Sequence, residues 1–94
     1  IVIYNKFTLV MTNKEILKKQ IIYRSMHRGT KEMDLLLGSF VKKYINELNL
    51  NDLKDLEKLL HIEDEILYKW YFEKNLKIFN PSSKISTLLK KFKI

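Results

Sequence analysis

The sequence predicts an all-α protein, a small single-domain bundle of about five short helices with short connections. Apolar residues recur at spacings of three and four along most of the chain, which is the period of a helix with one buried face. Residues that interrupt helices are rare, with two Gly and one Pro among 94 residues. A chain of this length has room for one compact core, so we expect a single domain.

Residues 1–10 are expected to lie outside the bundle. They are apolar and β-branched, carry no helix-capping signal and precede Met11. The stretch is too short for a membrane span, which needs ~20 apolar residues, and it lacks the basic start and small-residue cleavage site of a secretory signal. We therefore predict an N-terminal extension over residues 1–11, either flexible or non-native, and a helical domain over residues 12–94.

Thr12 marks the start of the first helix, because Glu15 three residues later completes a capping-box pattern. The apolar face of this helix is expected to continue to about His27. Its members are Ile16, Leu17, Ile21, Ile22, Tyr23 and Met26. Gly29 is expected to end the helix in the left-handed conformation that glycine adopts readily.

A second helix is predicted from Thr30 to about Leu48, with a buried face that repeats close to the helical period. That face comprises Met33, Leu36, Leu37, Phe40, Val41, Tyr44 and Leu48. After a turn over residues 49–52, Asn51 is the expected N-cap of a short third helix. The third helix buries Leu53, Leu56, Leu59 and Leu60.

The fourth helix is predicted to open with the acidic residues 63–65, which favourably face the positive end of the helix dipole. Trp70, between Leu67 and Tyr71, is expected to be the largest buried side chain of the protein. A loop then leads into a fifth helix, with Pro81 tolerated in the first turn. The apolar stripe of the fifth helix comprises Ile85, Leu88, Leu89 and Phe92.

The net charge of +7 is distributed unevenly. Residues 1–34 carry seven positive and three negative charges, residues 35–75 carry six and eight, and residues 76–94 carry five and none. A nucleic-acid-binding protein usually concentrates Lys and Arg along one stripe, with aromatic residues for stacking, whereas the aromatic residues here recur at core spacings. We therefore expect neither nucleic acid nor a membrane as the partner.

Catalytic and metal-binding patterns are lacking in the sequence. His27 and His61 have no second ligand at helical spacing. The acidic residues 63–65 lack the alternating ligands and the loop glycine of a calcium site. The chain has no Cys, which excludes disulfides and thiolate chemistry. We predict no catalytic residue, no metal site and no enzymatic activity.

Arginine is scarce in this chain, which contains 16 Lys but two Arg. Arg24 and Arg28 both fall within residues 24–38, together with both glycines. Because Arg presents a planar fork of donors to a carboxylate or phosphate, a position that keeps Arg in a Lys-rich chain is a candidate for recognition. The alternative is that the two arginines fall together by chance.

Residues 28–34 are expected to form an exposed polar corner between the first two helices. Arg24 and Arg28, four apart, would project from one side of the last turn, and Glu32 would lie in the next first turn, where the dipole favours a carboxylate. Gly29 has no side chain to block a partner's backbone. The alternative is a local ion pair between Arg28 and Glu32, which contributes only ~0–1 kcal/mol when exposed.

The segment from Tyr23 to Gly38 resembles the Arg-Gly-x-x-Glu signature of the SdhE-like succinate dehydrogenase flavinylation factors, with Arg28, Gly29 and Glu32 at the signature positions. Residues 55–72 are similar to the acidic turn and the Leu/Trp helix of that family. The resemblance extends over residues 14–92 without an evident insertion.

The resemblance implies a small helical assembly factor that binds the flavoprotein subunit of succinate dehydrogenase or fumarate reductase and promotes covalent attachment of FAD to a histidine of that subunit. It also implies that Arg28, Gly29 and Glu32 contact the partner, with Asp34 and Arg24 as weaker candidates. This chain would hold no cofactor stably, because FAD belongs to the partner, and it would be monomeric alone. The expected location is the bacterial cytoplasm, or the mitochondrial matrix in a eukaryote.

Two other function classes stay open. Antitoxin-like relatives would make the chain a regulatory binding protein for another target. A basic helical domain could instead bind RNA or an anionic membrane surface through its C-terminal lysines, which are Lys84, Lys90, Lys91 and Lys93. Phosphate-dominated binding falls steeply with added salt, so a salt titration separates this class from a protein interface with an apolar centre.

Overall fold

The computed structural model describes residues 12–75 and 83–94, and all regular structure in these two ranges is helical. The elements are α2 (Asn13–Met26), α3 (Lys31–Tyr44), the 3-10 helix η1 (Ile45–Glu47), α4 (Leu50–Leu60), α5 (Asp64–Tyr71) and α6 (Lys84–Lys91). The predicted all-α class is therefore confirmed over the described ranges. The predicted extension over residues 1–11 lies outside them.

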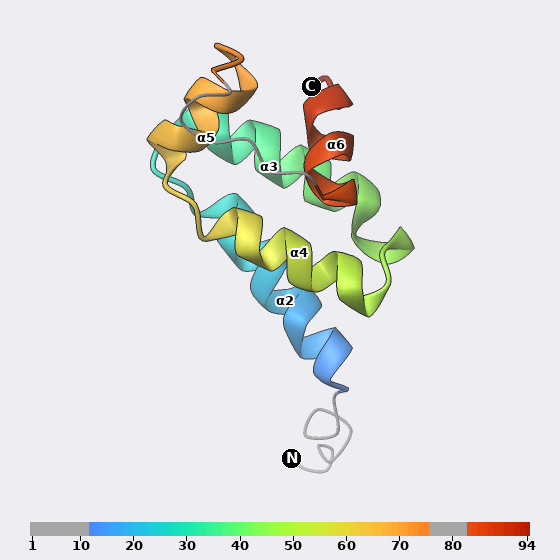
Figure 1. The fold of residues 1–94 in the computed structure, drawn as a ribbon. Coiled ribbons are helices and arrows are strands. Elements are labelled where there is room, and N and C mark those ends of the chain that lie inside the picture. Colours follow the sequence, from blue (N-terminus) through green and yellow to red (C-terminus); the bar gives the residue numbers. More distant parts are fainter. Residues whose placement is uncertain (1–11, 76–82) are drawn as a thin grey trace.

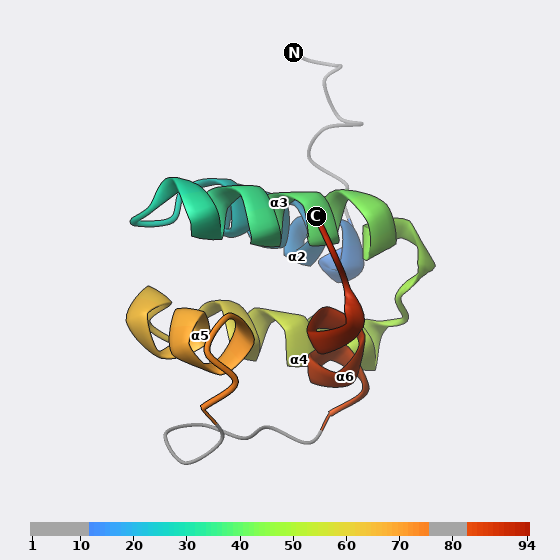
Figure 2. The same cartoon turned by 90° about the horizontal axis from the view of Figure 1, so that it is seen from above.

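The helices lie along two sides of the molecule. Figure 2 places α2 and α3 on one side and α4, α5 and α6 on the other, and Figure 1 shows α2 crossing beneath α4. α2 packs against both α3 and α4, while α6 packs against α4. In both views the turn between α2 and α3 lies at the same end of the molecule as the turn between α4 and α5. This arrangement brings together two turns that are far apart in the sequence.

Trp70 is the largest fully buried side chain, as predicted, with 1% of its surface exposed. It lies on α5, and the Lys90 ammonium group on α6 lies 5.5 Å from the centroid of its ring. The buried apolar residues are Ile21, Met33, Leu36, Leu37, Phe40, Val41, Ile45, Leu48, Leu53, Leu56, Leu59, Leu60, Leu67, Trp70, Ile85 and Leu89. The predicted faces of the second to fifth helices thus supply most of the core.

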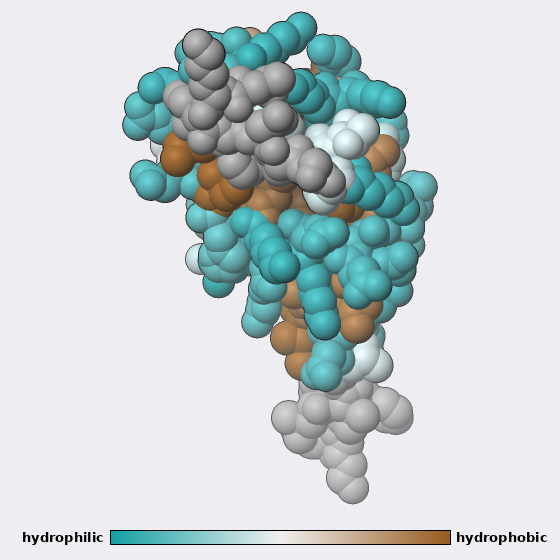
Figure 3. All heavy atoms as spheres, viewed as in Figure 1, coloured by the Kyte–Doolittle hydropathy of each residue, from teal (hydrophilic) through white to brown (hydrophobic). Residues whose placement is uncertain are grey.

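α2 buries a narrower stripe than the sequence predicts. Four residues of the expected face are between 40% and 64% exposed, namely Ile16, Ile22, Tyr23 and Met26. Successive residues of a helix point about 100° apart, so Ile21, Ile22 and Tyr23 cannot share one face. Ser25 takes a buried position four residues after Ile21, and its hydroxyl donates to the Ile22 carbonyl at 2.8 Å. The face drawn in Figure 3 is mostly hydrophilic, with hydrophobic surface over α5 and lower down, where α2 passes under α4.

Side-chain caps fix where α2 and α6 begin. Thr12 caps α2 as predicted, because its hydroxyl accepts the Glu15 N–H at 3.1 Å and the Glu15 carboxylate accepts the Thr12 N–H at 3.0 Å. Ser83 caps α6 in the same reciprocal way with Ser86. α6 begins at Lys84, and Pro81, for which the sequence predicts a place in the first turn, lies outside the described residues.

The predicted second helix is divided, and the third begins earlier than expected. α3 ends at Tyr44, and η1 carries the chain to Leu48, which is extended. Asn49 caps α4, so the prediction of Asn51 is wrong. The reason is that Asp52 lies three residues after Asn49 and completes a capping box, whereas the residue three positions after Asn51 is a lysine, which has no acceptor.

Candidate functional site

The corner between α2 and α3 comprises residues 27–30, and we call it the 27–30 corner. α2 ends at Met26, and the side chain of Thr30 caps α3. Neither glycine of the chain has a positive φ, so the prediction of a left-handed Gly29 is wrong. The chain instead leaves the helix at His27, where φ is −127° and ψ is 58°. Contacts from other elements hold the corner in place of a glycine turn.

The side chain of Arg28 points into the molecule and is only 9% exposed. Its Nε donates to Asp64 Oδ1 at 2.7 Å, and its Nη2 lies 2.6 Å from the same oxygen. Nη1 donates to the Leu60 carbonyl at 2.7 Å, and Nη2 donates to the Ile62 carbonyl at 3.0 Å. A planar fork with several donors makes these contacts at once, which a lysine cannot do.

Gly29 and Asp34 complete the polar network around the corner. The Gly29 N–H donates to Asp64 Oδ2 at 2.6 Å, and the Arg28 N–H donates to Asp34 Oδ1 at 2.5 Å. A Cβ atom at position 29 would lie 3.2 Å from Asp64 Oδ2, closer than most such contacts allow. A side chain at position 29 would therefore require the Asp64 carboxylate to shift by a few tenths of an ångström.

Two expectations about the arginines are wrong. Arg28 lies beyond the end of α2 and is turned inward, so it does not project beside Arg24, which remains exposed on α2. The local ion pair between Arg28 and Glu32 is not formed, because Arg28 pairs with Asp64 across 36 positions of sequence. Of the five predicted site residues, the structure gathers Arg28, Gly29 and Asp34 in one network and leaves Arg24 and Glu32 exposed.

Asp64 is the residue of this network that the sequence prediction missed. The sequence shows three acidic residues at 63–65, and helix capping accounts for all three equally. No local spacing distinguishes Asp64 from its neighbours, since its contacts depend on how two distant turns meet. The scarce Arg28, which requires an acceptor with matching geometry, is the one signal in the sequence that could have directed attention to a buried acidic partner.

Glu32 borders a hollow between the first turn of α3 and α5. The residues that line this hollow are Thr30, Glu32, Met33, Asp64, Glu65, Tyr68 and Lys69. Lys69 and Glu65 form an ion pair of 3.2 Å along α5. Glu32 thus presents its carboxylate on the surface next to the network that fixes the 27–30 corner.

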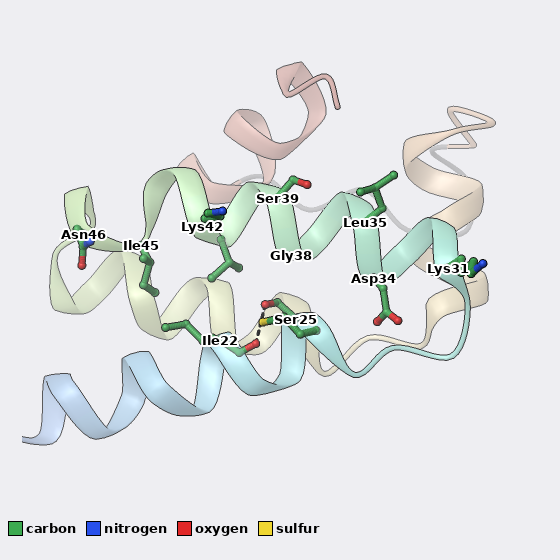
Figure 4. A pocket seen from close by; sticks show the side chains of 12 residues that line it. Ile22, Ser25, Lys31, Asp34, Leu35, Gly38, Ser39, Lys42, Ile45 and Asn46 are labelled. Atoms are coloured by element: carbon green, nitrogen blue, oxygen red, sulfur yellow. Dashed lines mark hydrogen bonds between the residues drawn. The ribbon is translucent and has the colours of Figure 1, made fainter.

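An apolar groove of about 740 Å³ runs between α2 and α3 from the corner toward η1. Figure 4 shows Ile22 and Ser25 on the side of α2 that faces α3, with Gly38 of α3 and Ile45 of η1 opposite them. Asp34 and Leu35 line the groove at the end near the corner. The groove and the corner therefore form one continuous surface.

The described residues were compared with two further kinds of site, a metal centre and a membrane span. Within residues 12–75 and 83–94, no three His, Cys, Asp or Glu side chains gather as a metal site would require. No helix in those ranges is both long enough and apolar enough to cross a membrane. His27 is occupied structurally, with Nδ1 2.7 Å from the Tyr23 carbonyl and its ring stacked on that of Tyr23 at 3.9 Å.

The fold and the fixed corner define a class of protein, a small all-helical protein with a polar corner that is held by side chains of other helices. Residues 19–93 match the family described as flavinator of succinate dehydrogenase, and the chain belongs to that family. The matched range includes the 27–30 corner and Asp64.

Three relatives illustrate the similarity. Succinate dehydrogenase assembly factor 2, mitochondrial, of Arabidopsis thaliana is 36% identical over 71% of this chain and 37% of its own length. The protein of the same name from Scheffersomyces stipitis is 43% identical over 60% of this chain and 38% of its own length. The FAD assembly factor SdhE of Acetobacter pasteurianus is 34% identical over 58% of this chain and 50% of its own length. The aligned part thus spans half or less of these curated relatives.

Proposed function

We propose that this protein is an assembly factor that binds the flavoprotein subunit of succinate dehydrogenase, or of the related fumarate reductase, and promotes covalent attachment of FAD to that subunit. The observation that carries the proposal is family membership over residues 19–93. Relatives named as assembly factors of succinate dehydrogenase or of FAD support it. None of these names describes an enzyme.

The chain would act by positioning its partner. The bond between flavin and histidine is formed by groups of the flavin and of the partner subunit, and this chain holds no cofactor of its own. A partner held with the two reacting groups aligned reacts faster, because the loss of orientational freedom has occurred on binding. A corner fixed by several hydrogen bonds suits this role, since little freedom of the corner is lost when the partner binds.

The exposed residues of the signature are the proposed contacts with the partner. Glu32, Gly29 and Arg24 are exposed and can touch a second protein, whereas Arg28 and Asp34 support the corner from within. The resemblance implies that Arg28 contacts the partner, whereas this proposal gives its side chain, 9% exposed, an internal role. Glu32 is the strongest candidate, because its carboxylate lies on the surface beside the fixed corner.

A protein partner is favoured over RNA by the contacts of the C-terminal lysines. Lys84 pairs with Asp52 at 3.2 Å, and Lys90 lies over the ring of Trp70. Two of the four lysines proposed for phosphate binding thus contact side chains of the protein, although Lys84 remains 64% exposed. We further propose that the chain is monomeric alone and acts in the mitochondrial matrix of a eukaryote or the cytoplasm of a bacterium, as the mitochondrial names of the eukaryotic relatives suggest.

The experiment is covalent flavin attachment in vitro. The isolated flavoprotein subunit is incubated with limiting FAD, with and without this chain, then denatured and examined for in-gel flavin fluorescence, which survives only if FAD is covalently attached. The chain is expected to increase the fluorescence, and Glu32→Ala is expected to lower the increase without changing helicity. Glu47→Ala, an exposed glutamate of η1, is the matched control and should behave as the unaltered chain.

Equal covalent flavin with and without the chain would exclude the assembly-factor function and favour the antitoxin-like alternative. Binding that disappears at moderate salt would instead favour a phosphate-bearing partner.

A further inference from the structure

We propose that Asp64, which lies outside the signature, is a positioning residue for partner binding. Its carboxylate holds the 27–30 corner in the geometry that presents Glu32. The inference rests on the proposed function, because the partner is the flavoprotein subunit. In this inference Arg28 and Gly29 act through contacts within the protein, and Glu32 makes the contact with the partner at the surface.

The two oxygens of Asp64 serve different parts of the corner. Oδ1 accepts from the guanidinium of Arg28 at 2.7 Å and 2.6 Å, and Oδ2 accepts from the Gly29 N–H at 2.6 Å. Asp34 Oδ1 accepts the preceding Arg28 N–H at 2.5 Å. Two successive backbone N–H groups are thus each bound by a carboxylate, which fixes the orientation of two successive peptide planes.

These contacts require a carboxylate and not merely a polar side chain of the same shape. A carboxylate has two acceptor oxygens, whereas the amide of asparagine has one acceptor and one donor group. In Asp64→Asn the single acceptor oxygen stays with the charged guanidinium of Arg28, which makes the stronger hydrogen bond, and the NH₂ group then faces the Gly29 N–H. The substitution therefore breaks one arm of the contact while keeping the volume of the side chain.

Glu32 depends on the corner through the first turn of α3. The body of α3 is fixed by buried side chains such as Met33, Leu36 and Leu37. The segment before it, residues 27–30, has no comparable burial and is held by the polar network. Asp64 and Glu32 also border the same hollow, so a displaced corner changes the surroundings of the Glu32 carboxylate.

The test is a double-substitution cycle measured on the isolated flavoprotein subunit. The dissociation constant is determined for the unaltered chain, Asp64→Asn, Glu32→Gln and the double variant, at a temperature at which circular dichroism shows all four folded. We expect Asp64→Asn to weaken binding of the subunit about tenfold. In the Asp64→Asn background, Glu32→Gln should weaken binding by less than about a further threefold, because the Glu32 carboxylate is already misplaced. A role confined to stability would leave the two effects independent.

Asp52→Asn is the matched control. Asp52 is also a largely buried carboxylate in the first turn of a helix, and it pairs with Lys84 at 3.2 Å at the opposite end of α4. Its replacement by Asn removes a charge, as Asp64→Asn does, but leaves the corner intact. We expect the dissociation constant of Asp52→Asn to stay within about twofold of the unaltered chain.

A second measurement needs no partner. Amide hydrogen exchange followed by NMR is expected to be at least about tenfold faster for the Gly29 N–H in Asp64→Asn, because that donor loses its acceptor, and unchanged in Asp52→Asn. Unchanged exchange at Gly29, unchanged affinity of Asp64→Asn, or fully additive effects would each overturn the inference. An unaltered chain that fails to raise covalent flavin would overturn the proposed function itself, which separates the two failures.

Discussion

Arg28 and Asp64 are 36 positions apart in the sequence, yet the guanidinium Nη2 of one lies 2.6 Å from the carboxylate Oδ1 of the other. The pair joins the turn that ends α2 to the turn that begins α5. The same guanidinium also binds the Leu60 carbonyl at the end of α4, a group that has no partner within its own helix. One side chain therefore fixes three helix ends, which makes the pair a structural element as well as part of the candidate site.

Arg28→Lys is expected to destabilise the protein, contrary to the expectation of an exposed Arg28. A lysine keeps the charge but cannot supply the donors for Asp64, Leu60 and Ile62 together. Each buried acceptor left without a donor costs ~1–3 kcal/mol, so the free energy of unfolding should fall by about 2–4 kcal/mol in a urea titration.

Arg24→Lys is the control for this substitution. Arg24 is exposed on α2, so the change should alter the free energy of unfolding by no more than ~0.5 kcal/mol. Equal stability of the two variants would show that the guanidinium network contributes nothing to folding.

Gly29→Ala is expected to lower the free energy of unfolding by about 1–3 kcal/mol, because the new Cβ atom meets Asp64 Oδ2 at 3.2 Å and Arg28 prevents that carboxylate from retreating. In an Asp64→Ala background the same substitution should cost less than ~0.5 kcal/mol, since the obstacle is gone. Thermal denaturation of the four proteins measures both values.

Gly38→Ala is the matched control for the glycine effect. Gly38 lies within α3, and a Cβ atom there would be 3.8 Å from Met26 Cγ, an ordinary contact. Because alanine is favoured over glycine in a helix by about 0.5–1 kcal/mol, this variant should be slightly more stable than the unaltered chain. A loss of stability would mean that the groove between α2 and α3 is packed more tightly than its geometry indicates.

Trp70→Ala is expected to lower the free energy of unfolding by about 3–5 kcal/mol, because it leaves a large cavity in the core. A loss of this size is a large part of the total stability of a small domain. A melting temperature within a degree or two of the unaltered chain would contradict the assignment of Trp70 to the core.

Thr12→Ala is expected to raise the pKa of Glu15. Hydrogen bonds from the backbone N–H and the hydroxyl of Thr12 hold this pKa below its ordinary value of 4.5. The stabilisation of the folded protein by the ionised Glu15 cap is therefore fully present above pH 4.5. It is lost as the pH falls through the lowered pKa of Glu15 in the folded protein. NMR titration of the Glu15 carboxyl should show the rise in Thr12→Ala and no change in Thr87→Ala, a control on α6.

The burial that follows the helical period was predicted, and the contacts that depend on the meeting of distant segments were not. The N-cap of α4 was missed although the local sequence contains the capping box of Asn49 and Asp52. Trp70 and the leucines of α4 follow the helical period, so their burial could be inferred from spacing alone. The buried stripe of α2 could not be inferred from spacing, because Ile21, Ile22 and Tyr23 point in three directions and only tertiary packing decides which of them is buried. The partner of Arg28 could not be chosen either, since Glu32 and residues 63–65 offer similar carboxylates and only the tertiary fold brings Asp64 within reach.

The acceptors around Arg28 also restrict how this chain can diverge. Two of the three are backbone carbonyls, at Leu60 and Ile62, and a backbone carbonyl is present whatever residue occupies its position. A mutation at position 64 can remove one acceptor, but no mutation can remove the other two. In a lineage whose codons change from arginine to lysine, we therefore expect Arg24 to be replaceable by lysine. Arg28 is expected to remain arginine as long as the turn between α4 and α5 keeps its shape.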